Sequence, residues 1–220
     1  MEILVIGLES EFEELKAKFG EKNALIHADH HSALKTDIQF DCIFDFLVGE
    51  SPDNFDFYNN LSDLDIFVNI PKISLQELLY FMEDRFENRV FGFNGLPTFI
   101  NREILEVSIL KEEDKLTLVE ICQNLGTDFE LVNDRVGMVT PRIIFMIINE
   151  AYYTVQEGTA TKEDIDLGMR LGTNYPYGPF EWCEKIGLNE VYETLEAIYE
   201  DTKDERYKIC PLLKTEYLKA

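Results

Sequence analysis

Seven short apolar segments recur through the first 132 residues, and helical patterns separate several of them. Each run spans roughly four to eight residues, the length of a buried strand and too short for most helices. Strands that alternate with helices favour a mostly parallel sheet covered by helices. The predicted strands are residues 2–7, 24–27, 41–48, 65–70, 89–93, 104–110 and 128–132. The predicted helices are residues 9–19, 55–61, 74–86 and 113–125.

A second pattern begins after residue 133, where the strand-like runs stop. Residues 138–156 are densely apolar, with spacings of three and four, which predicts a helix with one wide buried face. The sequence therefore favours an α/β domain at residues 1–133 followed by an all-α domain at residues 134–220. The residues assigned to the buried face of this helix are Val139, Ile143, Met146, Ile147, Glu150 and Ala151.

Local signals divide the helical part further. Gly158 is expected to end the long helix, because glycine adopts the backbone conformation that closes a helix. Thr161, with Asp164 three residues on, is typical of a capping box and predicts a helix that ends at Gly172. Proline and glycine between residues 176 and 179 then predict a turn before a short helix at residues 180–186.

The charge of the chain limits its partners. Its 220 residues contain 43 acidic and 20 Lys or Arg residues, a formal net charge of −23. Such a surface repels nucleic acid and anionic membranes, so neither is an expected partner. It also repels NAD and coenzyme A, which would each require a local positive potential. Solubility alone is the simpler explanation of the acidity.

The cysteines and the chain start indicate the compartment. Four cysteines lie far apart in the sequence, which fits a reducing environment and gives no disulfide framework or zinc motif. No apolar run reaches about 18 residues without polar interruption, so no membrane span is expected. The first residues, MEILVIG, lack the basic start of a signal peptide. These features predict a cytoplasmic protein.

Five short motifs in the helical part carry a family resemblance. They are N-E-A at residues 149–151, E-G at 157–158, E-D-I-D at 163–166, Y-P-x-G-P-F-E at 175–181 and I-G-L at 186–188. In this order and spacing they resemble the C-terminal domain of 3-hydroxyacyl-CoA dehydrogenases. The resemblance implies a reduced Rossmann-like, NAD-binding sheet domain, followed by a helical domain that closes the substrate cleft and forms a homodimer. It also implies a role in fatty acid metabolism, with acyl-CoA as a ligand.

The cofactor turn departs from the family pattern. A dinucleotide site normally has G-x-G-x-x-G between the first strand and helix, and here only Gly7 remains in Gly7-Leu8-Glu9-Ser10-Glu11-Phe12. Glu9 and Glu11 put carboxylates where a phosphate would lie. By resemblance the cofactor-binding positions are Gly7, Asp29 and Asn69, although the missing glycines predict that the usual NAD mode is lost.

The catalytic positions depart as well. In the family a histidine removes the hydroxyl proton, and a glutamate orients that histidine. By resemblance the histidine position falls on Asn94 and the glutamate position on Glu106. An asparagine can form hydrogen bonds but accepts no proton at useful pH. The family's substrate-binding asparagine falls on Pro141. Two interpretations therefore stay open, an NAD-linked 3-hydroxyacyl-CoA oxidoreductase and a catalytically inactive, dimeric acyl-CoA- or protein-binding homologue.

Three smaller expectations concern single residues. His27, His30 and His31 cluster near Asp29, and a loop after the second strand is preferred over a metal site. Trp182 is expected in the core or at an interface. Glu150 is expected to pair with Arg142 through a bridging group.

Overall fold

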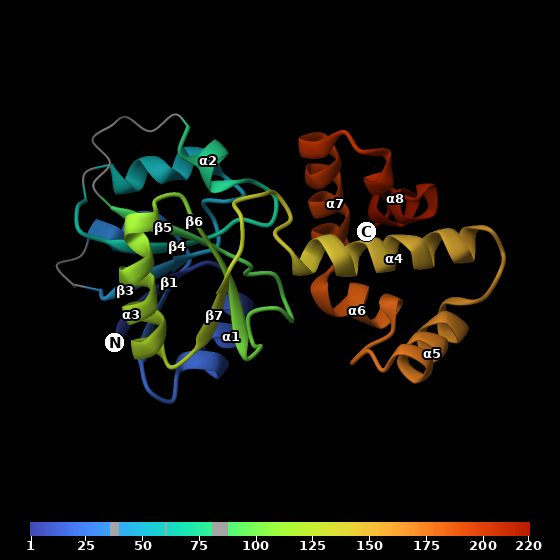
Figure 1. Ribbon diagram of the computed structural model, residues 1–220, viewed down its shortest axis with the longest axis horizontal. Helices are drawn as coiled ribbons and strands as arrows, with labels where there is room; N and C mark the ends of the chain where they lie inside the picture. The colour runs from blue at the N-terminus through green and yellow to red at the C-terminus, as the bar shows by residue number, and fades with distance from the viewer. Residues whose placement is uncertain (36–39, 60, 81–87) are drawn as a thin grey trace. The chain divides into compact units, whose positions relative to one another are not determined.

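The computed structural model describes residues 1–35, 40–59, 61–80 and 88–220 (Figure 1). The chain divides into two compact units, Met1–Met138 and Val139–Ala220. None of the helices in these ranges is both long and apolar enough to cross a bilayer.

The first unit is built on one seven-stranded sheet in the order β2-β1-β3-β4-β5-β6-β7. All neighbouring strands are parallel except β5 and β6. This confirms the predicted mostly parallel sheet, and all seven predicted strands are present. Their bounds are β1 Glu2–Ile6, β2 Ala24–Ala28, β3 Cys42–Asp45, β4 Asp65–Asn69, β5 Arg89–Phe93, β6 Ile104–Ile109 and β7 Asp128–Leu131.

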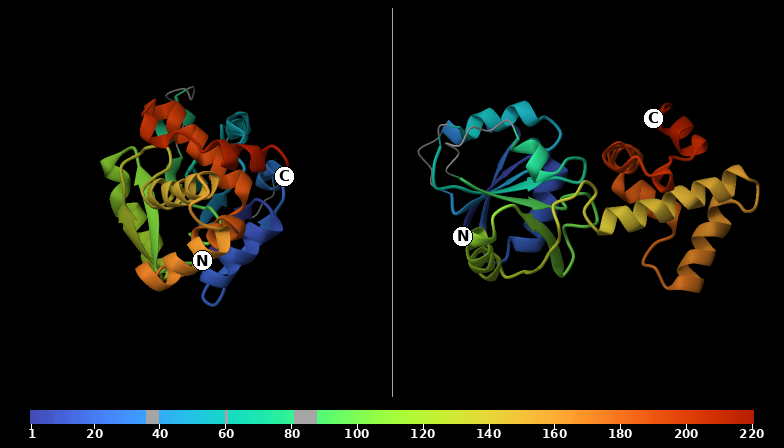
Figure 2. Two further views of the ribbon diagram at one scale, coloured as in Figure 1. Left: turned by 90° about the vertical axis from the view of Figure 1, so that its right-hand side faces the viewer. Right: turned by 45° about the horizontal axis from the view of Figure 1, so that its top comes forward.

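Helices cover both faces of this sheet, because the central strands are apolar on both sides (Figure 2). Helices α1 (Glu9–Phe19) and α3 (Lys115–Leu125) contribute to the core on one face. The 3₁₀ helix η2 (Pro52–Tyr58) and helix α2 (Leu75–Leu78) contribute to the core on the other. The predicted helix at residues 74–86 is present only as α2, which ends at Leu78 with Leu79 as its C-cap, and residues 81–87 lie outside the described ranges.

The strand order creates a switch point between β1 and β3. The chain runs from β1 to β2 on one side and then returns to place β3 on the other side of β1. Ligands of open α/β sheets bind at the carboxyl ends of strands at such a point. The connection from β2 to β3 contains the 3₁₀ helix η1 (His31–Lys35), and η3 (Glu112–Asp114) precedes α3.

The first unit extends to Met138, five residues beyond residue 133. Asp134 accepts hydrogen bonds from the backbone N–H groups of Leu75 and Gln76, at 2.8 and 2.9 Å, and so caps α2. The N–H of Gly137 donates to the carbonyl of Pro71 at 2.8 Å. Met138 itself is buried in the core on the α2 face. These long-range contacts attach the junction segment to the sheet.

The second unit is all-α. Helix α4 (Thr140–Gln156) is its centre, with α7 and α8 on one side and α5 and α6 on the other (Figure 1). The predicted caps of Thr161 and Gly158 are present: Thr161 Oγ1 accepts from the N–H of Asp164, and Gly158 has a positive φ of 73°. The remaining bounds are α5 Lys162–Thr173, α6 Pro179–Ile186, α7 Leu188–Thr202, η4 Glu205–Tyr207 and α8 Pro211–Tyr217.

The predicted buried face of α4 is wrong, because the observed buried face is displaced by about one residue around the helix. Of the six residues assigned to it only Ala151 is buried, whereas Val139 and Ile143 are 47% and 56% exposed. The helix is apolar around most of its circumference, so spacings of three and four fit two neighbouring faces. The buried residues are Pro141, Ile144, Phe145, Ile148, Asn149, Ala151 and Tyr152.

The expected pairing of Glu150 with Arg142 is also wrong. Arg142 donates to the hydroxyl of Tyr207 at 3.2 Å and lies 3.5 Å from the Asp201 carboxylate, while Glu150 is exposed. Both partners of Arg142 come from segments far along the chain. Trp182 is 5% exposed, as expected of a core residue.

Candidate functional site

The five residues assigned to a site lie along one edge of the sheet or beside it. Gly7 follows β1, Asp29 follows β2 and is exposed, Asn69 ends β4, and Asn94 follows β5. Glu106 lies on β6, which runs antiparallel to β5. The fold thus brings residues from distant parts of the sequence to the edge where α/β proteins bind ligands. Their roles remain predictions.

Asn94 and Glu106 form a direct pair. The Asn94 backbone N–H donates to the carbonyl of Glu106 at 3.3 Å, which extends the β5–β6 ladder by one step. On the same side, Asn94 Nδ2 donates to Glu106 Oε2 at 3.2 Å. Asn94 is 3% exposed and Glu106 half-buried. The carboxylate therefore orients the carboxamide, whose Oδ1 accepts a long hydrogen bond from the Leu96 N–H at 3.4 Å.

Asn69 holds the segment that follows Asn94. Its Oδ1 accepts a hydrogen bond from the N–H of Gly95 at 2.8 Å. A Cβ atom on Gly95 would lie only 2.8 Å from Asn69 Cγ and from Phe46 Cε1. Residue 95 must therefore be glycine for this close approach. Asn69 acts here as a positioning residue for the β5 segment.

The segment then turns at Thr98, which has a φ of 74°. A β-branched residue rarely adopts this conformation, so the turn is strained. The Thr98 N–H donates to Glu14 Oε1 on α1 at 3.0 Å. Burial raises the pKa of the Glu14 carboxyl, and backbone hydrogen bonds from this turn partly oppose that effect. Glu14 thus links α1 to the candidate site.

The β1–α1 turn is closed by its own carboxylate. The N–H of Leu8, the N-cap residue of α1, donates to Glu11 Oε2 at 2.6 Å, which is the half of a capping box that the N3 glutamate supplies. A Cβ atom on Gly7 would collide with that oxygen. Glu9 lies 3.0 Å from Nδ1 of His27, whose Nε2 is 2.8 Å from the Gly7 carbonyl. The N-terminus of a helix attracts anions, and here the Glu11 carboxylate of the chain itself already occupies that position.

Phe46 lies between the turn and the Asn69 segment, and sequence reasoning did not single it out. It follows β3 and is 1% exposed. A Cβ atom on Gly7 would lie 3.1 Å from Phe46 Cβ, and one on Gly95 would lie 2.8 Å from Phe46 Cε1. The ring thus fills space at the carboxyl edge beside the switch point. The available signal was a large aromatic residue at the end of a predicted inner strand.

Asp45, at the end of β3, is a second residue that sequence reasoning missed. His31 Nε2 and the Tyr58 hydroxyl each lie 2.7 Å from its Oδ2, and the N–H groups of Leu47 and Val48 donate to its Oδ1 at 2.8 and 3.0 Å. His31, Asp45 and Tyr58 are fully buried. Burial, followed by the nearby Asp45 charge, raises the pKa of Tyr58 well above its usual value.

The histidine cluster separates into different environments. His27 belongs to β2 and stacks on Phe12, with ring centroids 4.9 Å apart, while His31 lies in the core. His30 meets Phe57 edge-on. Within the part of the chain that the structure describes, no group of three or more His, Cys, Asp or Glu side chains is arranged to hold a metal ion.

Sequence comparison identifies the helical unit. Residues 137–219 match the family described as "3-hydroxyacyl-CoA dehydrogenase, C-terminal domain". A probable 3-hydroxybutyryl-CoA dehydrogenase of Bacillus subtilis (strain 168) is 36% identical over 135 residues, 60% of this chain and 47% of the relative. The 3-hydroxyadipyl-CoA dehydrogenase of Escherichia coli (strain K12) is 41% identical over 92 residues, 42% of this chain and 19% of the relative. The matched stretches thus span less than half of each relative.

Structure comparison extends the likeness in fold to the whole chain. The crystal structure of M. tuberculosis FadB2 has a TM-score of 0.79 at 16% identity, covering 99% of this chain and 93% of that one. The (S)-3-hydroxybutyryl-CoA dehydrogenase of Ralstonia eutropha has a TM-score of 0.70 at 19% identity, covering 97% and 92%. This chain therefore shares the fold of these two proteins over nearly its whole length, and its helical unit matches the C-terminal domain of the 3-hydroxyacyl-CoA dehydrogenase family.

Proposed function

We propose that this protein binds a 3-hydroxyacyl-CoA or 3-oxoacyl-CoA thioester and does not catalyse the NAD-linked oxidation performed by its dehydrogenase relatives. The relatives' names supply the ligand class. The occupied β1–α1 turn supports the loss of NAD-linked chemistry. A cytoplasmic location and a place in fatty acid metabolism are parts of the same proposal.

The observation that carries the proposal is the position of the Glu11 carboxylate. Glu11 Oε2 already accepts the Leu8 N–H, a donor that a bound pyrophosphate would need. The nearby Glu9 adds a second negative charge, and the buried Phe46 ring packs against Gly7. A dinucleotide bound in the family's manner does not fit these residues, because its phosphates would displace one carboxylate and face another. No hydride step is therefore assigned to this chain.

The Asn94–Glu106 pair supplies a contact for the thioester ligand. A carboxamide both donates and accepts hydrogen bonds, so Asn94 suits a carbonyl or hydroxyl oxygen of an acyl group. Glu106 holds that carboxamide in one orientation at 3.2 Å. By resemblance Asn94 stands at the position of the family's histidine base, and loss of a general base costs on the order of 10²–10⁴ in rate. The pair is therefore suited to binding.

The test is an assay of acetoacetyl-CoA and NADH together. We expect no NADH oxidation at high protein concentration and no change in NADH fluorescence. Calorimetry should detect binding of acetoacetyl-CoA. The substitutions Asn94→Ala and Glu106→Gln should each weaken binding of acetoacetyl-CoA. The matched control, Glu103→Gln, changes an exposed residue just before the same strand and should not. If acetoacetyl-CoA also fails to bind, the proposal is wrong.

An NAD-linked oxidoreductase is the second candidate, favoured by the dehydrogenase names of the relatives. In it, a water or substrate group would relay the proton. We expect that Asn94→His alone gives no NADH-dependent turnover, since the β1–α1 turn remains closed. Turnover gained from that single substitution, or turnover of the unmodified chain, would favour this candidate.

A homodimer through the helical unit belongs to the same proposal. Val139, the N-cap residue of α4, and Ile143, one turn further on, are exposed apolar residues beside the half-buried Met146 and Ile147. Such a stripe is a suitable surface for self-association.

A further inference from the structure

The helical unit contains a pocket of about 400 Å³ that no family role assigned above uses. Residues of α4, α5, α6 and the start of α7 line it. Tyr152 and Cys183, both nearly fully buried, form its inner part, and Phe180 and Leu188 contribute apolar surface. The pocket lies entirely within the second unit, so its shape depends on that unit alone.

The inner polar groups are neutral. Burial raises the pKa of the Cys183 thiol to about 12, and burial also raises the pKa of the Tyr152 phenol. A thiol with such a pKa is not a nucleophile at physiological pH. The Tyr152 hydroxyl donates to Glu216 Oε2 at 2.9 Å. These groups therefore shape the pocket and do not point to covalent chemistry.

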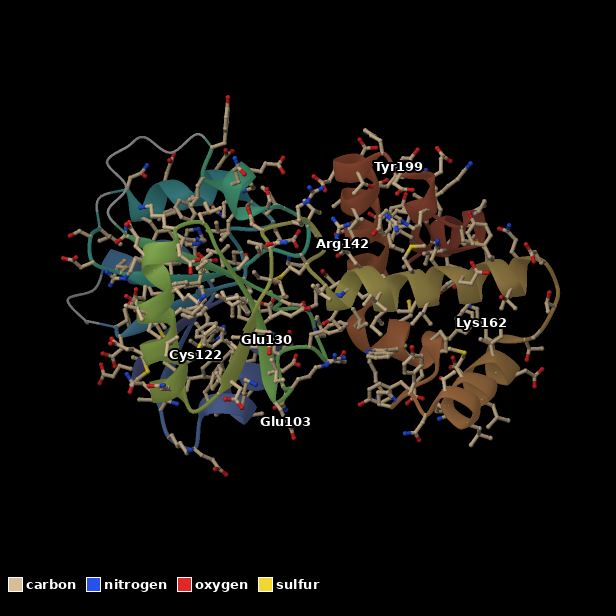
Figure 3. All side chains as sticks on the ribbon, in the orientation of Figure 1. Glu103, Cys122, Glu130, Arg142, Lys162 and Tyr199 are labelled. Atoms are coloured by element: carbon tan, nitrogen blue, oxygen red, sulfur yellow. The ribbon has the colours of Figure 1, made fainter. Side chains whose placement is uncertain are left out.

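A cation already occupies part of this environment. Lys162 Nζ lies 5.0 Å from the centroid of the Tyr152 ring and 5.1 Å from that of Phe180, within the range of cation–π attraction. It also lies 2.8 Å from each carboxylate oxygen of Glu216. Figure 3 labels Lys162 at the start of α5, beside α4. The ring faces and carboxylates of this region are thus arranged around an ammonium group.

The opening of the pocket carries uncompensated negative charge. Glu163 and Glu184 line it and are exposed, and neither has an ion pair or side-chain hydrogen bond within the described ranges. Asp166, in contrast, accepts the N–H groups of Phe180 and Glu181 at 2.8 and 3.0 Å. The lining therefore combines apolar surface with two unpaired carboxylates, while its single Lys is neutralised by Glu216.

We propose that this pocket binds an alkylammonium group. The apolar stem would lie against Phe180 and Leu188, and the ammonium would face Glu163 and Glu184. Pockets of this size usually combine apolar walls with a few polar groups that orient the ligand. The negative lining disfavours anions, which include coenzyme A and NAD. A free amine and the side chain of a lysine in a polypeptide share this chemistry.

The test compares three small ligands on the full chain. n-Butylammonium, butyrate and 1-butanol have similar stems and differ in charge, and backbone amide NMR shifts report binding residue by residue. We expect saturable shifts at Phe180, Cys183 and Leu188 with n-butylammonium in the millimolar range, and weaker or no shifts with the other two. A lysine-containing neutral peptide that binds more tightly would indicate a polypeptide source, and equal binding would indicate a free amine.

Charge-neutral variants separate the pocket from the general acidity of the chain. The double variant E163Q/E184Q should weaken n-butylammonium binding by about tenfold, because each carboxylate contributes a modest ion pair. Glu157→Gln is the control, since it removes the same charge from an exposed residue outside the pocket. Absence of saturable shifts, equal shifts with butyrate or 1-butanol, or equal loss in the control would overturn the inference. These outcomes are independent of the acetoacetyl-CoA assay.

Discussion

At the scale of single residues, Asp45 shows how one buried side chain organises the first unit. Four hydrogen bonds converge on its two oxygens, from His31, Tyr58, Leu47 and Val48. They join the end of β3 to η1, to η2 and to the loop that begins with Phe46. Because these groups are buried, the loss of their common acceptor would leave several of them unsatisfied.

Replacement of this acceptor should be costly. Asp45→Asn puts an NH₂ group where one oxygen accepted, and we expect the free energy of unfolding to fall by about 3 kcal/mol. Tyr58→Phe removes one of the four hydrogen bonds and should cost about 1 kcal/mol. Urea denaturation measures both. Equal effects of the two variants would contradict a network centred on Asp45.

The buried thiols predict sensitivity to alkali. Burial raises the pKa of Cys122 and of Cys183 from 9.0 to about 12. Above about pH 9 the unfolded chain releases protons that the folded chain keeps, so stability falls as pH rises toward about 12. Each thiol contributes a slope of about 1.4 kcal/mol per pH unit.

Denaturation at a series of alkaline pH values measures this slope. Cys122→Ala should remove one thiol's share of it while retaining the decline caused by Cys183 and by Cys42, whose pKa burial also raises. A free energy of unfolding that stays constant between about pH 9 and pH 11 would rule out this linkage.

At the scale of elements, the start of α1 explains how the sheet domain folds without an anion at its first turn. Glu11 supplies the negative charge that favours a helix N-terminus and accepts the Leu8 N–H. Gly7 remains necessary because a side chain there would collide with Glu11 and crowd Phe46. The glycine is thus explained by packing within the chain as well as by resemblance.

Removal of this internal cap should destabilise the domain. We expect Glu11→Ala to lower the free energy of unfolding by about 1 kcal/mol, and Glu11→Gln by less, since an amide oxygen still accepts. Glu13→Ala on the same helix removes only an exposed pair with Lys16 and should cost less than about 0.5 kcal/mol. Thermal or urea denaturation measures the series, and a Glu11→Ala variant as stable as Glu13→Ala would refute the assigned cap.

At the scale of the whole molecule, exposed apolar residues bear on whether the chain associates with a second copy. Exposed apolar residues one turn apart occur in the second unit at Val139 and Ile143, at the start of α4, and at Leu167 and Leu171 on α5. Leu116 on α3, in the first unit, is 76% exposed. A stripe one or more turns long gives a self-complementary surface around a two-fold axis, which an isolated residue does not.

The proposed homodimer can be tested by charge insertion. Ile143→Glu places a charge on this surface. If the interface buries residue 143, the substitution should weaken the free energy of association by several kcal/mol. Sedimentation at micromolar concentration should then show a monomer in place of the dimer. Leu116→Glu is the matched control and should remain dimeric. A monomeric unmodified chain at that concentration would contradict the proposal.

Much of the fold was predictable from local patterns. All seven strands, the Thr161 cap and the stop at Gly158 depend on short contiguous segments, and each is present. The pairing of Asn94 with Glu106 was predictable only through the family resemblance. The 3₁₀ form of η2 was not predicted, because a helical pattern of seven residues does not distinguish the two helix types.

The sequence by itself determined the alternation of strands and helices, the family of the helical unit and the absence of the glycine-rich turn. Only the tertiary structure decided that Glu11 closes that turn, that Phe46 fills the adjacent edge, that Asp45 joins His31 and Tyr58, and which face of α4 is buried. The physical reason is the distance along the sequence over which each effect acts. Propensity and periodicity act within a segment, whereas the partner of a side chain depends on which distant segments the fold brings beside it.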